Sequence, residues 1–228
     1  DVTAGYWNPA GLSGMKKQYE LGAMHAEYFT GIAKYDYLGG AMAVDSLQHL
    51  GLSLIRFGVD NIPNTTELID QQGNIDYERI SYFSAADYAL LFSYSRKTGI
   101  PHLQAGANVK IIHRSIGHFA SSWGFGLDLG VQYHRGNWHL GGIIRDVTTT
   151  FNAWQFNQKA LLTHAGDSTF NQAPENNLEL TLPRIIPGAA YQAEISRHFD
   201  VMVEADLEIT TDGRRHTLIS FDPFSIAP

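Results

Sequence analysis

The residues that first invite a chemical role are the ten histidines. His113 and His118 flank a predicted loop, and His134 and His139 flank a predicted turn. A helical zinc motif would place two histidines four positions apart on one helix, and other zinc sites use cysteine, which this chain lacks. We therefore interpret the histidines as scattered polar side chains and expect no metal site.

Catalytic groups of other kinds are no better supported. A serine hydrolase needs a nucleophile, a base and a residue that orients the base. The chain contains no Gly-x-Ser-x-Gly elbow, and the pair Ser121-Ser122 is near His118 only in sequence. A glycine-rich phosphate loop is also absent from the sequence. We predict that the protein is not an enzyme and uses no cofactor.

A row of carboxylates, Glu204, Asp206 and Glu208, occupies one face of a predicted strand at intervals of about 7 Å. That spacing could suit paired carboxylates in acid–base catalysis. The simpler interpretation is an acidic wall inside a barrel, balanced by basic residues on other strands. The side chains predicted to face this lumen are Asn108, Lys110, Asp128, Arg145, Glu204, Asp206 and Glu208.

The strands that would position these groups are clearest between Leu103 and Asp146. Apolar and polar residues largely alternate there in three runs: Leu103–Arg114, Trp123–Arg135 and Trp138–Asp146. The intervening Arg135-Gly136-Asn137 predicts a tight hairpin connection. We therefore expect an antiparallel sheet whose two faces see different environments.

Two assemblies produce such strands. A strand of a soluble sandwich usually has about 5–6 residues, whereas a strand of a membrane barrel needs roughly 9–11 and turns its apolar face to lipid. The runs found here are of the longer kind, and aromatic residues gather near their ends, as they do in the interfacial girdles of membrane barrels. A soluble ligand-binding barrel, with its apolar face inside, remains open on the pattern alone.

Composition limits the alternatives. The chain has 228 residues, 44% of them hydrophobic, with a mean hydropathy of −0.17. A barrel is apolar only at alternate positions, so these values do not oppose a membrane location. No run approaches the ~18 apolar residues of a membrane helix. The net charge of −7, with basic residues scattered, argues against a nucleic-acid partner.

The predicted strands and their connections agree with an up-and-down barrel. Two long connections, 59–85 and 147–175, fall on the same side of such a barrel, and the connections on the opposite side are short, as in outer-membrane barrels. Eleven strands are predicted, at about 17–28, 33–44, 48–58, 86–97, 103–114, 122–135, 137–146, 176–182, 188–196, 199–210 and 215–221.

Closed single-chain barrels usually have an even number of strands. The odd count of eleven suggests that a strand is missing at the C-terminal side. Because the chain also begins at Asp1 without Met, we expect residues 1–228 to form a single barrel domain that is incomplete at both ends. Residues 1–14 do not have the pattern of a strand, and Asn8-Pro9-Ala10-Gly11 has turn chemistry. This segment is either a lead-in loop or a hatch folded inside the lumen.

Three stretches resemble the PorV/PorQ family. Asp1–Leu12, which contains Asn8-Pro9-Ala10, resembles the N-terminal hatch signature of that family, and the Asn-Pro-Ala also occurs in the hatch of FadL-type transporters of hydrophobic solutes. Trp123–Asp128 followed by Arg145–Trp154 resembles the middle of PorV-like barrels, and Gly213–Ser220 resembles their late hairpin.

The resemblance implies a FadL-like barrel of fourteen strands in the outer membrane of a Gram-negative bacterium, without a cofactor, serving the type IX protein secretion system. Its partners would be outer-membrane lipid, translocon subunits and secreted proteins with C-terminal sorting domains. The implied hatch residues are Trp7, Asn8, Pro9, Ala10 and Gly11.

On this hypothesis the hatch plugs the lumen and the barrel serves as a docking body. The long connections would then present aromatic side chains to partners: Tyr77, Tyr82, Phe83, Phe151, Trp154 and Phe156. The alternative is a FadL-like transporter of hydrophobic small molecules, which predicts an apolar pocket near the hatch.

Overall fold

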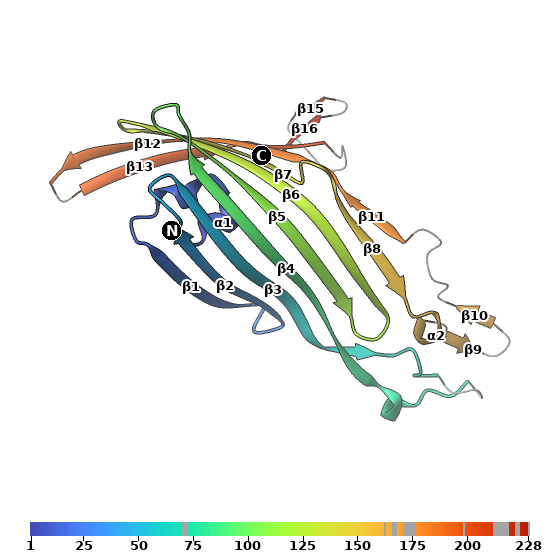
Figure 1. Ribbon diagram of the computed structural model, residues 1–228. Helices are drawn as coiled ribbons and strands as arrows, with labels where there is room; N and C mark the ends of the chain where they lie inside the picture. Colours follow the sequence, from blue (N-terminus) through green and yellow to red (C-terminus); the bar gives the residue numbers. More distant parts are fainter. Residues whose placement is uncertain are drawn as a thin grey trace.

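A single strongly curved antiparallel sheet dominates the protein, and the N-terminal segment lies on its concave side (Figure 1). The computed structural model describes residues 1–69, 73–161, 163–165, 168–170, 177–197, 199–211, 219–221 and 224–227. Within these ranges the sheet contains fourteen strand segments. The predicted all-β, antiparallel architecture is confirmed.

The first seven strands follow one another around the sheet, each hydrogen-bonded to the next: β1 (Tyr19–Tyr28), β2 (Ala33–Ala43), β3 (Gln48–Asn64), β4 (Ser81–Lys97), β5 (Leu103–Ile116), β6 (Ala120–Arg135) and β7 (Trp138–Arg145). Short turns join them at one end.

In the turn before β3, the backbone N–H groups of Leu47 and Gln48 donate to Asp45 at 2.7 and 2.8 Å, which lowers the pKa of the Asp45 carboxyl. Gly136 takes a positive φ of 58° in the predicted hairpin after β6.

The remaining wall is built from interrupted strands. β7 and β8 (Thr150–Phe156) both pair with β6, and the six residues 145–150 stand opposite only three, 126–128. The surplus forms a bulge at 146–149, where Asp146 and Thr149 have φ values of 56° and 61°. Within the bulge, Val147 N–H still donates to Leu127 O at 2.9 Å. A bulge of this kind bends the strand while keeping part of its ladder.

Two further strands continue the sheet beyond the bulge. β11 (Leu178–Thr181) and β12 (Arg184–Ser196) pair with β8 and β7 respectively. From Arg184 to Glu194, β12 also pairs in one register with β13 (Phe199–Asp206) and β14 (Glu208–Thr210), and the register shifts between Glu194 and Ser196. β13 and β14 are separated at Leu207, which lies opposite Pro187. Pro187 has no N–H to donate to Leu207, so only one hydrogen bond remains there, from Leu207 N to Pro187 O at 3.0 Å.

The short elements are α1 (Ala4–Trp7), η1 (Pro9–Gly14), η2 (Tyr77–Arg79), α2 (Gln158–Leu161), β9 (Thr163–Ala165), β10 (Ser168–Phe170), β15 (Ile219–Phe221) and β16 (Phe224–Ala227). Among the described residues, no helix is long and apolar enough to cross a membrane. β1 forms one edge of the sheet, and the described pairings do not join it to the last strands.

The outer face of the sheet is apolar and exposed. Leu52, Phe92, Val109 and Leu127 form one register row across β3 to β6, and all four side chains are exposed. On β6 this face runs from Trp123 to Tyr133, about 25 Å along the barrel axis for a strand tilted by roughly 40°. That height matches the apolar band of an outer-membrane barrel.

Next to the N-terminal segment, the inner face carries buried polar side chains beside a small apolar cluster of Tyr37, Ile55 and Leu91. Ser93, Asn108 and Asp128 occupy an inner row of the same strands and are at most 4% exposed. A soluble ligand barrel would show the reverse arrangement, with apolar side chains inside. The burial pattern therefore supports a membrane barrel and not a soluble one.

The predicted strand positions are right for most of the sheet and differ from the structure in three places. β3 and β4 extend to Asn64 and from Ser81, so the predicted connection 59–85 shortens to 65–80. The predicted connection 147–175 contains β8, a full part of the wall. The predicted strand 215–221 falls mostly on residues outside the described ones. β12 begins at Arg184, four residues before the predicted start.

We predict that a cation in the middle of the outer face destabilises the barrel. Leu127→Arg should lower the free energy of unfolding by about 2–4 kcal/mol, because the guanidinium would lie in the hydrocarbon layer. Leu103→Arg, a matched substitution at the end of the same face, should cost about 0–1 kcal/mol. Denaturant titration of protein refolded into lipid vesicles measures both, and equal losses would contradict the assigned membrane-facing surface.

Candidate functional site

Residues 1–14, called the hatch from here on, fold into two short helical turns on the inner wall. Asn8 separates α1 from η1, and its side-chain oxygen accepts from Ala10 N at 3.1 Å, which caps η1. Pro9 follows at the first helical position, where its missing N–H costs nothing. The Asn-Pro-Ala sequence thus has a local reason: it ends one turn and starts the next.

The amide nitrogen of Asn8 binds the hatch to the wall. Its Nδ2 donates to Val131 O on β6 and Gly142 O on β7, each at 3.2 Å. One side chain therefore caps a helix with its oxygen and bridges two strands with its nitrogen. An aspartate could not make both sets of bonds, because its carboxylate has no donor.

Polar side chains of the inner wall satisfy backbone carbonyls of the hatch. Asn108 donates to Gly5 O at 2.8 Å, Ser95 donates to Ala10 O at 2.9 Å, and the Tyr37 hydroxyl donates to Val2 O at 3.0 Å. Beneath these bonds Leu12 is fully buried in an apolar cluster with Val2, Met15 and Ala41. The hatch is therefore fixed by apolar packing and by hydrogen bonds from several strands.

Two glycines let the hatch lie directly on the wall. A methyl group at Gly106 would strike the backbone N of Ala10, and one at Gly130 would strike the side chain of Asn8. Both positions face inward on strands whose neighbouring residues have larger side chains. The requirement for close approach explains these glycines without any special backbone angle.

A buried ionic network stabilises the bulge. Lys110 Nζ contacts Asp128 Oδ1 at 2.7 Å and Asp146 Oδ1 at 2.5 Å, and Asp146 N donates to Asp128 at 3.0 Å. Thr150 also donates to Asp146. The lysine comes from β5, one carboxylate from β6 and the other from the bulge itself. This arrangement pairs charges that would be costly to bury alone.

Arg145 connects the bulge to the hatch. Its Nη2 donates to Tyr6 O at 3.3 Å, and its guanidinium lies 5.2 Å from the centre of the Tyr6 ring. Within the described part of the chain it has no carboxylate partner within 4 Å. Its cation is therefore held by a carbonyl and an aromatic face.

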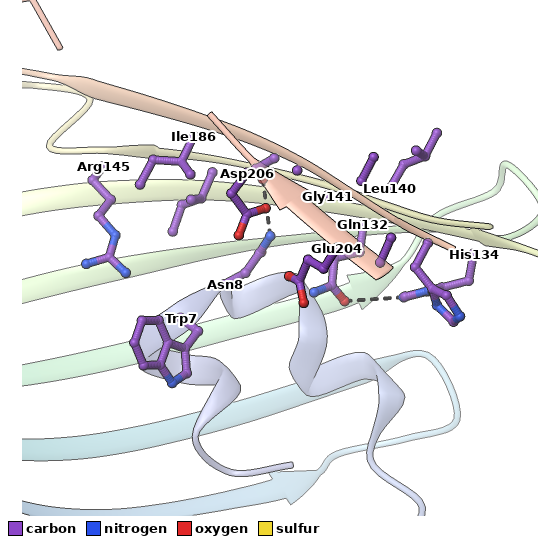
Figure 2. Close-up of a pocket in the computed structure, with 16 residues that line it drawn as sticks. Trp7, Asn8, Gln132, His134, Leu140, Gly141, Arg145, Ile186, Glu204 and Asp206 are labelled. Carbon is purple, nitrogen blue, oxygen red and sulfur yellow. Dashed lines mark hydrogen bonds between the residues drawn. The ribbon is translucent and has the colours of Figure 1, made fainter. Parts of the chain in front are cut away.

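A cavity of about 400 Å³ opens between the hatch and β6, β7, β12 and β13 (Figure 2). Most of its lining is apolar, but charged and imidazole side chains also face it, and it is called the polar cavity below. On one side of it are Trp7 and Asn8 from the hatch, and on the other are Glu204 and Asp206 from β13. Its remaining lining is Gln132, His134, His139, Leu140, Gly141, Gly142, Ile143, Arg145, Ile186, Gly188, Ala189 and Ala190.

An aromatic cavity of about 360 Å³ lies between the hatch and the first two strands. Its lining is mainly apolar and contains Thr3, Tyr6, Trp7, Gly22, Ala23, Met24, Tyr28, Tyr35 and Tyr37. Tyr37 is also the donor to Val2 O, so one residue both anchors the hatch and lines the cavity. The apolar pocket that the transporter hypothesis requires near the hatch is therefore present.

The structure brings the residues predicted to face the lumen onto the inner wall in three groups. Asn108 and Asp128 are buried near the bulge beside the partly buried Lys110, whereas Arg145, Glu204 and Asp206 line the polar cavity. Glu208 is half-buried and pairs with Arg184 at 3.1 Å. Sequence position did not predict this grouping, because Glu204, Asp206 and Glu208 follow one another in the chain and yet Glu208 pairs with Arg184 while the other two face the cavity.

The residues assigned to partner-facing loops require correction. Tyr77 lies in η2 within a connection, as predicted. The other five lie in strands: Tyr82 and Phe83 in β4, and Phe151, Trp154 and Phe156 in β8. Trp154 donates to Glu179 at 2.8 Å and has the Arg114 guanidinium 5.2 Å above its ring. The bulge at 146–149 interrupts the alternation of apolar and polar residues, and for this reason β8 was predicted as part of a loop.

Sequence reasoning missed two features of the site. It treated His134 and His139 as scattered, but their Nδ1 atoms lie 2.7 Å apart across the hairpin. It also missed the aromatic cavity, although Tyr35 and Tyr37, two positions apart in a predicted strand, place two aromatic rings on the same face. No group of three or more His, Asp or Glu side chains suited to a metal occurs among the described residues.

No protein-family model matches the sequence, and no curated protein matches it. Among solved structures, the chain is similar to the TodX deltaS2S3 mutant monoaromatic hydrocarbon channel, with a TM-score of 0.54 and 15% sequence identity. The fold is that of a FadL-like barrel. The similarity covers 93% of this chain and 66% of that channel, so the chain spans just under two thirds of the channel's length. At this identity the likeness shows the fold alone, and the closer resemblance to PorV/PorQ stays a prediction.

We predict that Gly106→Val loosens the hatch, because its side chain would displace Ala10 from the wall. Amide exchange in peptides from residues 1–14, followed by mass spectrometry, should be at least about tenfold faster, which corresponds to about 1.4 kcal/mol. Gly141→Val is the matched control, since a Cβ there meets no atom within 4 Å. Equal protection in both variants would show that the hatch does not depend on close approach at Gly106.

Proposed function

We propose that this protein is an outer-membrane barrel that binds apolar small molecules beside its hatch and passes them across the membrane. The observation that carries the proposal is the aromatic cavity between α1 and strands β1 and β2. A FadL-like fold supports it, as does the monoaromatic hydrocarbon channel to which the chain is structurally similar.

The lining of the aromatic cavity favours an apolar ligand. Tyr28 and Tyr35 project from adjacent strands, and Met24 supplies an adaptable thioether. Apolar walls with few polar groups are typical of small-molecule sites, and aromatic rings contribute most of the contact area in them. The hatch closes one side of the cavity, so binding would precede any movement of ligand past it.

We predict that Tyr35→Ala weakens the binding of toluene about tenfold, because one ring contact worth about 1.4 kcal/mol is lost. Phe92→Ala is the matched control, since Phe92 is exposed on the outer face and far in register from the cavity. Calorimetric titration of purified protein in detergent, against a detergent blank, measures both. Failure of the wild-type barrel to bind any apolar ligand would overturn the proposal.

Docking in type IX secretion is a second proposal, supported by an arm that contains the described residues 60–69 and 73–84. β3 and β4 extend past the ends of β2 and β5, at Ala33 and Ile116 respectively, and pair with each other alone beyond Val59 and Ala85. Phe83 braces the arm against Phe119, with ring centroids 5.1 Å apart. Exposed apolar residues on the arm are Ile69, Ile75, Tyr77 and Tyr82.

On this second proposal, a tagged wild-type barrel should recover translocon subunits or secreted proteins with C-terminal sorting domains from detergent-solubilised membranes. The double variant Tyr77→Ser/Tyr82→Ser should recover them at least about tenfold less, because two exposed anchors are removed. Phe29→Ser, at an exposed site in the turn after β1, should not change recovery. Quantitative mass spectrometry decides, and recovery of the barrel alone in every case would exclude docking.

A further inference from the structure

The two cavities beside the hatch share one residue. Trp7 lines both the polar cavity and the aromatic cavity, whereas its neighbours Tyr6 and Asn8 each line only one of them. The indole therefore stands as a partition between an apolar compartment and a polar one. Figure 2 shows it at the edge of the polar cavity, beside Asn8.

The neighbours of Trp7 are fixed, but its indole is weakly held. Tyr6 accepts a hydrogen bond from Arg145 through its carbonyl and contacts the same guanidinium with its ring. Asn8 is hydrogen-bonded to two strands. The Trp7 ring makes an edge contact with Tyr6 at 5.0 Å and is 65% exposed. Within the described residues its N–H has no hydrogen bond. A rotation of this side chain would therefore break little and would connect the two compartments.

The charge of the polar compartment has a definite sign. Glu204 and Asp206 face it from β13 and form no ion pair with any described cation. Arg145 also lines the cavity, where its guanidinium contacts Tyr6 and keeps its positive charge. The next residue, Asp146, belongs to the buried network, which has two carboxylates for one lysine. His134 and His139 face each other through nitrogen atoms, so both cannot be protonated at that contact. With both imidazoles neutral, the two carboxylates outnumber the single guanidinium, so the net charge of the side chains that line the polar cavity is negative.

We propose that the two cavities are the halves of one site for an amphipathic amine, an inference that rests on the proposed function for its apolar half. The apolar body of the ligand lies among Tyr28 and Tyr35, and its ammonium group is received by Glu204 and Asp206. Trp7 divides the halves and can face the ammonium group with its ring, an arrangement favourable for a cation. The polar half thus selects among ligands that the aromatic half would accept equally.

Gly141 provides a way to close the polar half without disturbing the wall. It forms part of the cavity lining, and a Cβ there would meet nothing within 4 Å. Gly141→Leu therefore fills space that a ligand would occupy. Neutralising the carboxylates with Glu204→Gln/Asp206→Asn removes the charge and keeps the shape. Glu194→Gln/Asp200→Asn is the matched control at the far end of the same strand pair.

The test compares three probes that share a benzene ring: 2-phenylethylamine, 2-phenylethanol and 3-phenylpropionate. Calorimetry at pH 7 with the full chain should give the amine about tenfold higher affinity than the alcohol, and the carboxylate the lowest affinity. Both Gly141→Leu and Glu204→Gln/Asp206→Asn should abolish the preference for the amine. Glu194→Gln/Asp200→Asn should retain it.

Toluene serves as the reference for the apolar half. Normal toluene binding combined with equal affinities for amine and alcohol would overturn the two-part site while leaving the proposed function intact. A wild-type protein that does not bind toluene would overturn the proposed function. An amine preference that survives Glu204→Gln/Asp206→Asn would also overturn this assignment.

Discussion

The structure depends on one constraint, the separation of apolar and polar side chains onto opposite faces of a sheet whose backbone groups pair with one another. A membrane offers no water to an unpaired N–H or C=O, so the strands must satisfy each other and send polar side chains inward. The inner wall then accumulates charge that needs partners. Lys110 meets this need for Asp128 and Asp146, and in doing so fixes the bulge that bends the wall.

The hatch completes the inner wall. Its carbonyl groups would be unsatisfied against an apolar surface, but Asn108, Ser95 and Tyr37 each donate to one of them. Glycines permit the contact, and Leu12 supplies the apolar packing. The hatch does not fill the curved interior uniformly, however. It leaves an aromatic cavity on one side and a polar cavity on the other, with Trp7 between them.

The strand limits were predicted correctly where apolar and polar residues alternate without interruption along a whole strand. The alternation in β5 and β6 was unambiguous, and their limits lie within two residues of those expected. The prediction failed where a bulge shifts the alternation. Around Asp146 the chain has three residues more than the facing part of β6, and β8 was therefore predicted as a loop. The prediction also placed the ends of β3 and β4 too early. Beyond the barrel these two strands pair only with each other, so their residues need not alternate between a lipid-facing row and an inner row.

The sequence by itself determined that the protein is an antiparallel barrel with strands of membrane length, and that its N-terminal segment is not a strand. These properties follow from the local period and from residue chemistry, both of which are readable along the chain. Only the tertiary structure decided which face is buried, which charges meet and where the cavities lie. Those outcomes depend on the register between strands and on how the hatch settles against glycines more than ninety residues away, as at Gly106, and neither is encoded in any single local pattern.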